Sequence, residues 1–450
     1  MAFILLIAQL LIVPNALPAA SGSRVYLPLL TNNRPLDTVF GIEMSQLAPT
    51  TGLNLVLTSG TGWVRRNAML WSEIEPVEGA GYRWDVPSMQ QLETEMLAAN
   101  AGKLQLILVV RSSPNWAVAP YSAECGPVNS SKRVAFARFM AAAVARYSVP
   151  PYNVRYWEIG NEPDATLIAD DFVYGCWGIE GDPYYGGREY GEVLKAVYPA
   201  MKQVNPRIQV LNGGLLLANP YTVTNSATVA GRFFEGMLET GAGNAFDITS
   251  FHTYTYYSTG PQPFGPPMDW RISYLKELLQ RYGVPPKPLI RTEAALLCVD
   301  VTPACRWAQA DLVGRVYART LRDGLLATIW YIYDSDSYHN TAMIEPGDVF
   351  VPRPTYFAYR YVATLLGGAA FLGAIEGLPS NIEGYTFRNG GSTIYTLWTD
   401  DRGRIPTQLR VAPEYNVSCF SRDGAPIACT HKDGLVSFLV DQSPLYIVVS

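Results

Sequence analysis

Short apolar runs alternate with longer helical patterns over about three hundred residues of this chain. Eight of these runs are rich in β-branched and aromatic residues, and they begin near Val39, Trp63, Leu104, Val154, Ile208, Ile248, Leu289 and Ala327. The intervals between them are too long for hairpins. They suit strands that pair in parallel through helical crossovers.

Segments between the runs carry apolar residues at spacings of three and four, as a helix packed on a core requires. Examples are residues 131–148 (SKRVAFARFMAAAVARYS) and 188–204 (REYGEVLKAVYPAMKQV). Eight strand–helix units that close on themselves predict a (β/α)₈ barrel of the α/β class over residues 38–367. An open, doubly wound sheet is the alternative.

The pattern changes at about Gly368. Short stretches of alternating apolar and polar residues follow, separated by Gly, Pro, Asn and Asp, and they include NIEGYTF, STIYTLWT, TQLRVA, GLVSFLV and LYIVV. This pattern predicts a small all-β sandwich over residues 368–450.

The N-terminus has the features of an export signal. Residues 3–13 are apolar apart from Gln9, and small residues follow at 19–22, which predicts a secretory signal over residues 1–22 and a linker over 23–37. The apolar run is too short to span a bilayer, so no membrane span is expected. An uncleaved apolar arm is the alternative to a secreted or extracytoplasmic location.

Six cysteines suit an oxidising destination. Cys298 with Cys305 and Cys419 with Cys429 are close in sequence, which leaves Cys125 and Cys176 as a third pair. Other connectivities, and free buried thiols, stay open on the sequence alone.

Composition and motifs exclude several functions. The chain has 34 Lys and Arg against 39 Asp and Glu, a formal charge of −5, so nucleic acid is not an expected partner. It has three histidines, none in an HExxH spacing, and it lacks a GxSxG elbow, a phosphate loop and a complete GxGxxG. No metal or other cofactor is implied.

Two glutamates follow apolar strands at the barrel's predicted carboxyl edge, where active sites of this architecture are built. Glu162 ends the fourth strand in VRYWEIGNEPD, and Pro163 stops that strand from continuing. Glu293 ends the seventh in PLIRTEAALL. Strands four and seven lie on opposite sides of a closed barrel, so both carboxyl groups are expected to face one cleft.

Paired carboxyl groups suit the hydrolysis of an acetal, because one donates a proton to the leaving oxygen while the other meets the charge that develops at the anomeric carbon. A separation of about 5 to 5.5 Å predicts retention of configuration, and one of about 6.5 to 9.5 Å predicts inversion. Arg65 on the second strand is the candidate cation for Glu293, and its neighbour Arg66 is expected to point outward.

The string WEIGNEPD, with a later glutamate after an apolar strand, resembles clan A of the glycoside hydrolases, in particular family 39 and its neighbours. The resemblance implies a retaining enzyme on a (β/α)₈ barrel that cleaves O-glycosidic bonds of oligo- or polysaccharides, with β linkages expected. Glu162 would be the acid/base, Glu293 the nucleophile, and Asn161 a partner of the sugar 2-hydroxyl. Substrate contacts are further expected from His252 and Tyr254 in FHTYTY, from Trp330 in ATIWYIYD, and from Trp116 in RSSPNW.

Other interpretations of these residues stay open. Asp300 or Glu158 could replace Glu293, although Glu158 is expected to pair with an arginine inside the barrel. His252, Tyr254, Trp330 and Trp116 could be ordinary core residues. A catalytically silent barrel that binds saccharides, or a structural scaffold, are the rival functions.

Overall fold

A computed structural model describes most of the chain beyond residue 37. The described residues are 38–120, 123–165, 175–179, 181–218, 230–260, 263–264, 269–345, 347 and 350–450. The signal and linker predicted for residues 1–37 lie outside them.

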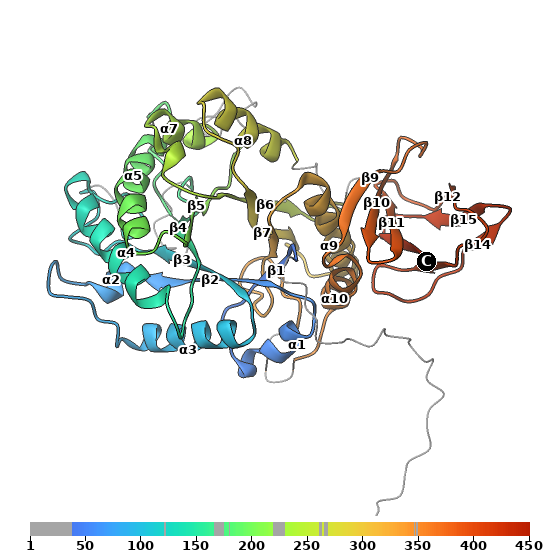
Figure 1. Cartoon of the computed structure of the whole chain (residues 1–450), viewed down its shortest axis with the longest axis horizontal. Coiled ribbons are helices and arrows are strands. Elements are labelled where there is room, and N and C mark those ends of the chain that lie inside the picture. The colour runs from blue at the N-terminus through green and yellow to red at the C-terminus, as the bar shows by residue number, and fades with distance from the viewer. Residues whose placement is uncertain are drawn as a thin grey trace, which may run out of the picture. The chain divides into compact units, whose positions relative to one another are not determined.

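Eight parallel strands form a closed barrel, which confirms the predicted fold (Figure 1). The sheet order is β5-β4-β3-β2-β1-β8-β7-β6, and bridges from Leu211 to Ile248 and from Leu215 to Phe251 join β5 to β6. The strands are β1 Phe40–Glu43, β2 Trp63–Leu70, β3 Gln105–Arg111, β4 Tyr156–Asn161, β5 Gln209–Gly214, β6 Thr249–Tyr256, β7 Leu289–Leu297 and β8 Thr328–Trp330.

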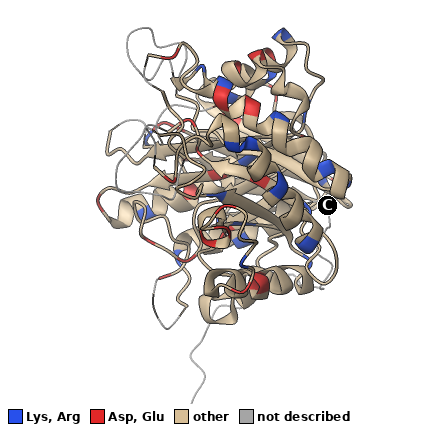
Figure 2. Cartoon of the chain, turned by 90° about the vertical axis from the view of Figure 1, so that its left-hand side faces the viewer, with Lys and Arg blue, Asp and Glu red and all other residues tan. Residues whose placement is uncertain are grey.

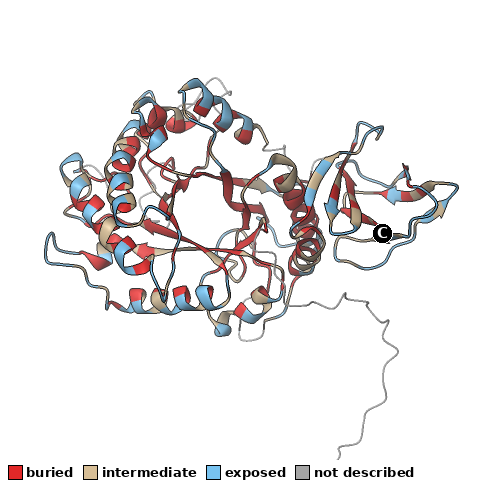
Figure 3. Ribbon diagram, viewed as in Figure 1, coloured by how far each residue is buried: buried red, intermediate tan, exposed pale blue. Residues whose placement is uncertain are grey.

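Helices in the crossovers surround the strands. They are α1 Leu53–Leu57, α2 Trp71–Ile74, α3 Pro87–Ala101, α4 Arg133–Tyr147, α5 Gly187–Val204, α7 Phe233–Glu239, α8 Trp270–Arg281, α9 Pro303–Asp323 and α10 Pro354–Leu366, with 3₁₀ turns at Pro49–Thr51, Ser130–Lys132 and Ala242–Asn244. Figure 3 shows the strands buried and the outer helix faces exposed. Among the described residues, no helix combines the length and apolarity that crossing a membrane requires. Basic and acidic residues are interspersed along the ribbon drawn in Figure 2.

The barrel interior is layered along its axis. Apolar side chains from the first residues of the strands fill its amino-terminal end, namely Trp63, Ile107, Tyr156, Leu211, Ile248, Ile290, Ala327 and Ile329. Buried polar side chains occupy the carboxyl end, among them Glu43, Arg65, Glu158, His252 and Glu293. The apolar side chains close one end of the barrel. The polar side chains that can take part in a reaction therefore lie at the other end, which is the carboxyl face.

The C-terminal region is antiparallel and all β, as predicted. One sheet has the order β13-β16-β11-β10-β9 and the other β12-β15-β14. Their strands are β9 Ala370–Ala374, β10 Ile382–Asn389, β11 Ser392–Thr399, β12 Ile405–Arg410, β13 Val417–Phe420, β14 Thr430–Lys432, β15 Leu435–Val440 and β16 Leu445–Val449. Of these, β9, β13 and β14 were not anticipated, because they are short and bury few side chains.

Three disulfides join the cysteine pairs expected from the sequence. They are Cys125–Cys176, Cys298–Cys305 and Cys419–Cys429. The first spans 51 residues and ties the segment after β4 to the loop after β3.

Candidate active site

A bulge in β7 turns Glu293 into the barrel. The strand continues to Leu297, so Glu293 lies in its middle, and the prediction that it ends the strand is wrong. Pairing with β6 passes from Phe251↔Arg291 to His252↔Glu293, with a register shift between them, and pairing with β8 shifts between Arg291 and Ala294. A bulge adds one residue to a strand and re-aims the side chains beyond it. Glu293 consequently faces the interior, whereas Arg291, two residues earlier, lies on the outer face beside residues of α9.

The end of β4 presents Glu162 through an unusual backbone. Gly160 has φ of 78° and Glu162 has φ of 47°, which is the left-handed region that residues with a Cβ seldom adopt. Pro163 follows, and it disfavours the right-handed helical conformation at the residue before it. The chain therefore leaves the strand sharply at Glu162, and the carboxyl group is held at the rim with a side-chain exposure of 12%.

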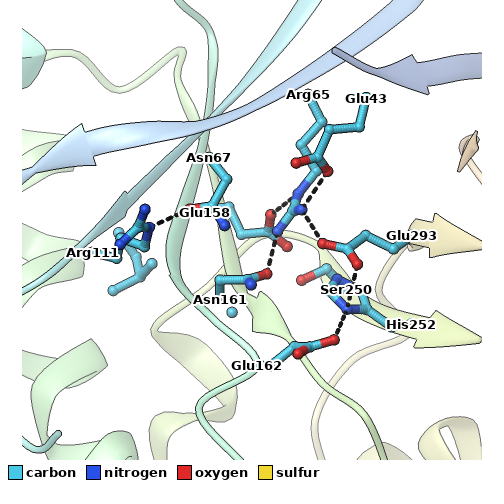
Figure 4. Close-up of polar contacts among 12 residues, drawn as sticks. Glu43, Arg65, Asn67, Arg111, Glu158, Asn161, Glu162, Ser250, His252 and Glu293 are labelled. Atoms are coloured by element: carbon cyan, nitrogen blue, oxygen red, sulfur yellow. Dashed lines mark hydrogen bonds and ion pairs between the residues drawn. The ribbon is translucent and has the colours of Figure 1, made fainter. Parts of the chain in front are cut away.

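Arg65 is the hub of the polar cluster (Figure 4). Its Nη1 donates to Glu43 at 2.7 Å and to Glu293 at 2.5 Å, and its Nε donates to Glu158 at 2.7 Å. Its Nη2 donates to the amide oxygen of Asn161 at 2.7 Å. The guanidinium is wholly buried, so the carboxylates hold it through desolvated, charge-assisted hydrogen bonds that fix the position of each. Arg66 points the other way and pairs with Glu95 on α3.

His252 links the two predicted catalytic groups. Its Nδ1 lies 2.7 Å from Glu162 Oε1 and 3.5 Å from Glu293 Oε2. One side-chain ligand atom from each of Glu162, His252 and Glu293 lies within 4.8 Å of the other two. Oxygens of the two carboxyl groups thus approach to within this distance, at the centre of the barrel's carboxyl face.

The cluster holds more carboxyl groups than cations. Burial raises the pKa of Glu293 well above its ordinary value, with Arg65 opposing the rise and Glu43 and Glu162 adding to it. Burial also raises the pKa of Glu43, again against Arg65. Burial and the charge of Arg65 lower the pKa of His252 well below 6.5, so the imidazole is neutral at physiological pH. One guanidinium therefore faces several carboxyl groups, and such a set retains a proton that its members share.

Tyrosines line the cluster on the side of β6 and β8. The Tyr254 hydroxyl donates to Glu293 Oε2, and its ring packs edge-on against Tyr331 and Tyr338. Burial and the negative charge of Glu293 raise the pKa of Tyr331, which places that hydroxyl in the field of the same cluster. The three rings form a partly apolar wall beside the carboxyl pair.

The other predicted residues are placed differently. Trp330 is completely buried, with its indole N–H on the Thr341 carbonyl, so it offers a ligand no surface, and the adjacent Tyr331 lies by the cluster instead. Trp116 packs on Trp71 and donates to the Glu75 carbonyl, and no contact within the described residues joins it to the glutamates.

The two residues that could have replaced Glu293 lie in different places. Asp300 is exposed beyond the end of β7. Glu158 lies in the interior and pairs with Arg65, as expected of a structural ion pair.

Three members of the site were not predicted from the sequence. Glu43 ends the apolar strand FGIE, and this is the same signal that identified Glu162 and Glu293. Tyr331 directly follows β8, so its position too was open to prediction. Tyr338 comes from a loop, and no periodicity marks it.

Glu162, His252 and Glu293 also form a grouping that could coordinate a cation. Glu293 already accepts hydrogen bonds from Arg65 and Tyr254 on its two oxygens. A metal ion would therefore have to compete with a buried guanidinium for the same carboxylate. The donor set suits proton transfer and nucleophilic attack better than metal binding.

Comparison with known proteins places the fold. No protein-family model and no curated protein sequence match the chain. A family 39 glycoside hydrolase from the gut symbiont Bacteroides cellulosilyticus WH2 superposes with a TM-score of 0.69 at 22% identity, covering 93% of this chain and 82% of that one.

Two further solved structures agree with it. The family 30 subfamily 8 xylanase Xyn30A from Clostridium acetobutylicum has a TM-score of 0.64 at 13% identity, over 91% of this chain and 95% of that one. The family 39 enzyme from Xanthomonas axonopodis pv. citri has a TM-score of 0.59 at 13% identity, over 92% and 94%. The resemblance expected from the sequence is thus confirmed in three dimensions: this chain has the fold of these glycoside hydrolases.

Proposed function

We propose that the protein is a retaining glycoside hydrolase in which Glu162 is the general acid/base and Glu293 the nucleophile. The observation that carries the proposal is the approach of the two carboxyl groups, whose nearest oxygens lie within 4.8 Å. Retaining enzymes need about 5 to 5.5 Å between their carboxyl groups, and inverting enzymes need about 6.5 to 9.5 Å to admit a water. The short separation favours direct attack by the enzyme.

In the first step, Glu293 attacks the anomeric carbon while protonated Glu162 donates its proton to the glycosidic oxygen. A carbon–oxygen bond to Glu293 forms, the glycosidic bond breaks, and the aglycone leaves as an alcohol. In the second step, ionised Glu162 takes a proton from a water, the water oxygen attacks the anomeric carbon, and Glu293 leaves as a carboxylate. Two displacements at one carbon retain its configuration.

The surroundings of Glu293 favour the second step in particular. Arg65 and Tyr254 donate one hydrogen bond to each oxygen of its carboxylate. These donors stabilise the negative charge that returns to Glu293 when the glycosyl group departs. The same donors keep the carboxylate in one orientation for attack.

His252 would position the carboxyl group of Glu162. The neutral imidazole lies against Glu162 at Nδ1, so it can exchange a hydrogen bond with either protonation state of that carboxyl group. We propose that Asn161 hydrogen-bonds the sugar 2-hydroxyl, because it stands directly before Glu162 in the chain. Its amide oxygen accepts a hydrogen bond from Arg65. Tyr254 and Tyr331 would provide the adjoining wall of the sugar site.

The substrate class is an oligo- or polysaccharide with β-linked sugars. One similar structure is described as a xylanase and another as a β-xylosidase, and the same linkage is proposed for this chain. Three disulfides support an extracytoplasmic location, where such polymers are encountered.

Azide rescue of two alanine variants tests the assignment, with activated aryl glycosides as substrates. Glu293→Ala is expected to lose at least about 10³-fold in kcat, and added azide should restore turnover to a glycosyl azide of inverted configuration. Glu162→Ala should accumulate the glycosyl-enzyme, and azide should release it as the retained glycosyl azide. Glu277→Ala, an exposed change on α8, is the control and should keep full activity.

Three outcomes would contradict the proposal. Full activity in Glu293→Ala, no rescue in either variant, or an inverted first product in anomeric NMR of the parent would each do so. Measurable oligosaccharide binding without turnover of any aryl glycoside would instead identify a silent saccharide-binding barrel. Turnover that survives a metal chelator is expected.

A further inference from the structure

A polar cavity lies between the outer face of the β6–β7 wall and helix α9. It measures about 60 Å³ and includes Thr253, Asp269, Arg291, Arg315, Arg319 and Asp400 in its lining. A buried water needs about 10 to 15 Å³ on this measure, so the cavity has room for about four waters or one small polyatomic ion. Three arginines line this small cavity, so the charge of an occupant decides whether it fits there.

Arg291 is the unusual member of this lining. It is 3% exposed, and its side chain makes no hydrogen bond or ion pair with any residue that the structure describes. The guanidinium lies 5.7 Å from the centre of the Phe251 ring, and its Nε is buried without a hydrogen-bond partner among these residues. The bulge in β7 that turns Glu293 inward is what directs Arg291 outward. Burial lowers its pKa to about 10, which still leaves it charged at neutral pH. A buried, unpaired guanidinium is costly, and proteins seldom keep one without a counter-charge.

The nearby acids are already engaged elsewhere. Asp269 and Asp323 both accept from Arg322, each at 2.7 Å. Asp400 accepts from Arg315 at 2.5 Å. The charges of Asp269 and Asp323 favour the protonated form of Arg291, although neither carboxylate forms a direct pair with it.

The hydrogen bonds of the neighbouring arginines show which guanidinium N–H groups at the cavity have no partner among the described residues. Arg319 is committed to a bidentate pair with Glu383. Arg315 uses both Nη groups on Asp400 and on backbone carbonyls, but its Nε is buried and has no partner among the described residues. The donors at the cavity without a partner among the described residues therefore include the guanidinium of Arg291 and the Nε of Arg315. The Thr253 hydroxyl on β6 adds a neutral group beside them.

We infer that this cavity is a binding site for a small tetrahedral oxyanion, held chiefly by Arg291 on the outer face of β7. A guanidinium presents a planar fork of donors that matches two oxygens of such an ion. The bound ion supplies the counter-charge that Arg291 lacks on the barrel wall. It stabilises the fold without taking part in glycoside chemistry.

Thermal unfolding of the full chain tests the site, with inorganic phosphate as the probe. Phosphate is titrated at constant ionic strength against a bulky organic sulfonate, which is too large to enter. The parent should show a saturable rise in Tm of about 2 °C or more. Arg291→Met should lose this rise, and in the sulfonate buffer its Tm should equal or exceed that of the parent, because an unpaired buried charge has been removed. The exposed control Arg404→Met should keep the rise.

Each result decides the inference. No saturable rise in the parent, or an equal rise in Arg291→Met, overturns it, and an equal or larger rise with chloride overturns the assignment to an oxyanion. Should Arg291→Met fail to fold, crystals of the parent grown in selenate provide the decision. An anomalous peak within hydrogen-bond reach of the Arg291 guanidinium supports the site, and its absence overturns it.

Discussion

At the scale of single residues, the site depends on how closely side chains from different strands approach. His252 reaches Glu162 only because β5 ends in a glycine. A Cβ placed on Gly214 would overlap His252 Nε2 and would lie 2.7 Å from the Thr292 hydroxyl. Both contacts are far inside van der Waals distance, so the absence of a side chain at residue 214 is a condition for the position of the imidazole.

Gly214→Ala is therefore expected to displace His252 and to lower kcat/KM at least about tenfold, since small misplacements of catalytic groups are costly. It should also destabilise the fold by about 1–3 kcal/mol through overpacking. Enzyme kinetics and thermal unfolding measure the two effects. Gly391→Ala is the control, because a Cβ there meets nothing within 4 Å. An unchanged kcat/KM in Gly214→Ala would show that catalysis does not depend on this position of the His252 imidazole.

Glu293→Gln should raise stability in a pH-dependent way while abolishing activity. Because burial raises the pKa of Glu293, its contribution to stability is complete below the unfolded pKa of about 4.3 and is lost as pH rises through the folded value. Glutamine cannot ionise, so the variant's advantage in stability should grow from about pH 4 upward. Thermal unfolding across pH measures it, with exposed Glu277→Gln as a flat reference. A constant difference at all pH values would contradict the raised pKa.

At the scale of elements, the segment after β4 is fastened to the catalytic strand. Gly175 donates its N–H to the Asn161 carbonyl, and Trp177 donates to the Pro163 carbonyl at 3.1 Å. The Cys125–Cys176 disulfide lies between these contacts, and the Cys176 N–H donates to the Cys125 carbonyl at 3.0 Å. The bond thus joins the loop after β3 to the rim residues that position Glu162.

Removing this disulfide as Cys125→Ser/Cys176→Ser should lower both stability and kcat/KM. Loop-closure entropy predicts a loss of about 4 kcal/mol for its 51-residue separation, against about 3 kcal/mol for the 10-residue separation of Cys419–Cys429. Denaturant unfolding measures the difference. The control Cys419→Ser/Cys429→Ser should leave kcat/KM unchanged. Equal effects of the two variants on kcat/KM would mean that the first disulfide has no role in positioning Glu162.

At the scale of the whole molecule, helix α9 joins the barrel to the C-terminal strands. Arg319 on α9 makes a two-point pair with Glu383 on β10, and Arg422 near β13 pairs with Asp311 on α9. The apolar core of the barrel extends without a break to Tyr385, Phe387 and Trp398 of the C-terminal strands. The two parts should therefore unfold together.

Glu383→Ala is expected to lower the free energy of unfolding by about 2 kcal/mol, because it leaves a largely buried guanidinium unpaired. Near-ultraviolet circular dichroism and tryptophan fluorescence should report one coincident transition in both parent and variant. Glu277→Ala, which breaks an exposed pair within α8, should cost less than about 0.5 kcal/mol. Two separated transitions in the parent would show that the C-terminal region is an independent folding unit.

The sequence alone determined the order of the elements. All eight barrel strands begin within two residues of their expected starts, because strands buried on both faces need continuous apolar runs and the crossovers need helical periodicity. It also determined that Glu162 directly follows the apolar run of β4, since a carboxylate is costly to bury within such a run and is tolerated where the run meets the polar face of the barrel. The same expectation was wrong for Glu293, which lies in the middle of β7 with four buried apolar residues after it.

Only the tertiary structure decided which side chains meet. The bulge at residue 292 separates Arg291 from Glu293, and no local pattern in PLIRTEAALL predicts it. The convergence of Glu43, Glu158 and Glu293 on one buried guanidinium, and the short distance between the two proposed catalytic carboxyl groups, arise from barrel closure. Periodicity along a chain specifies the face on which a residue lies, but distances between strands are set by how the whole sheet curves and closes.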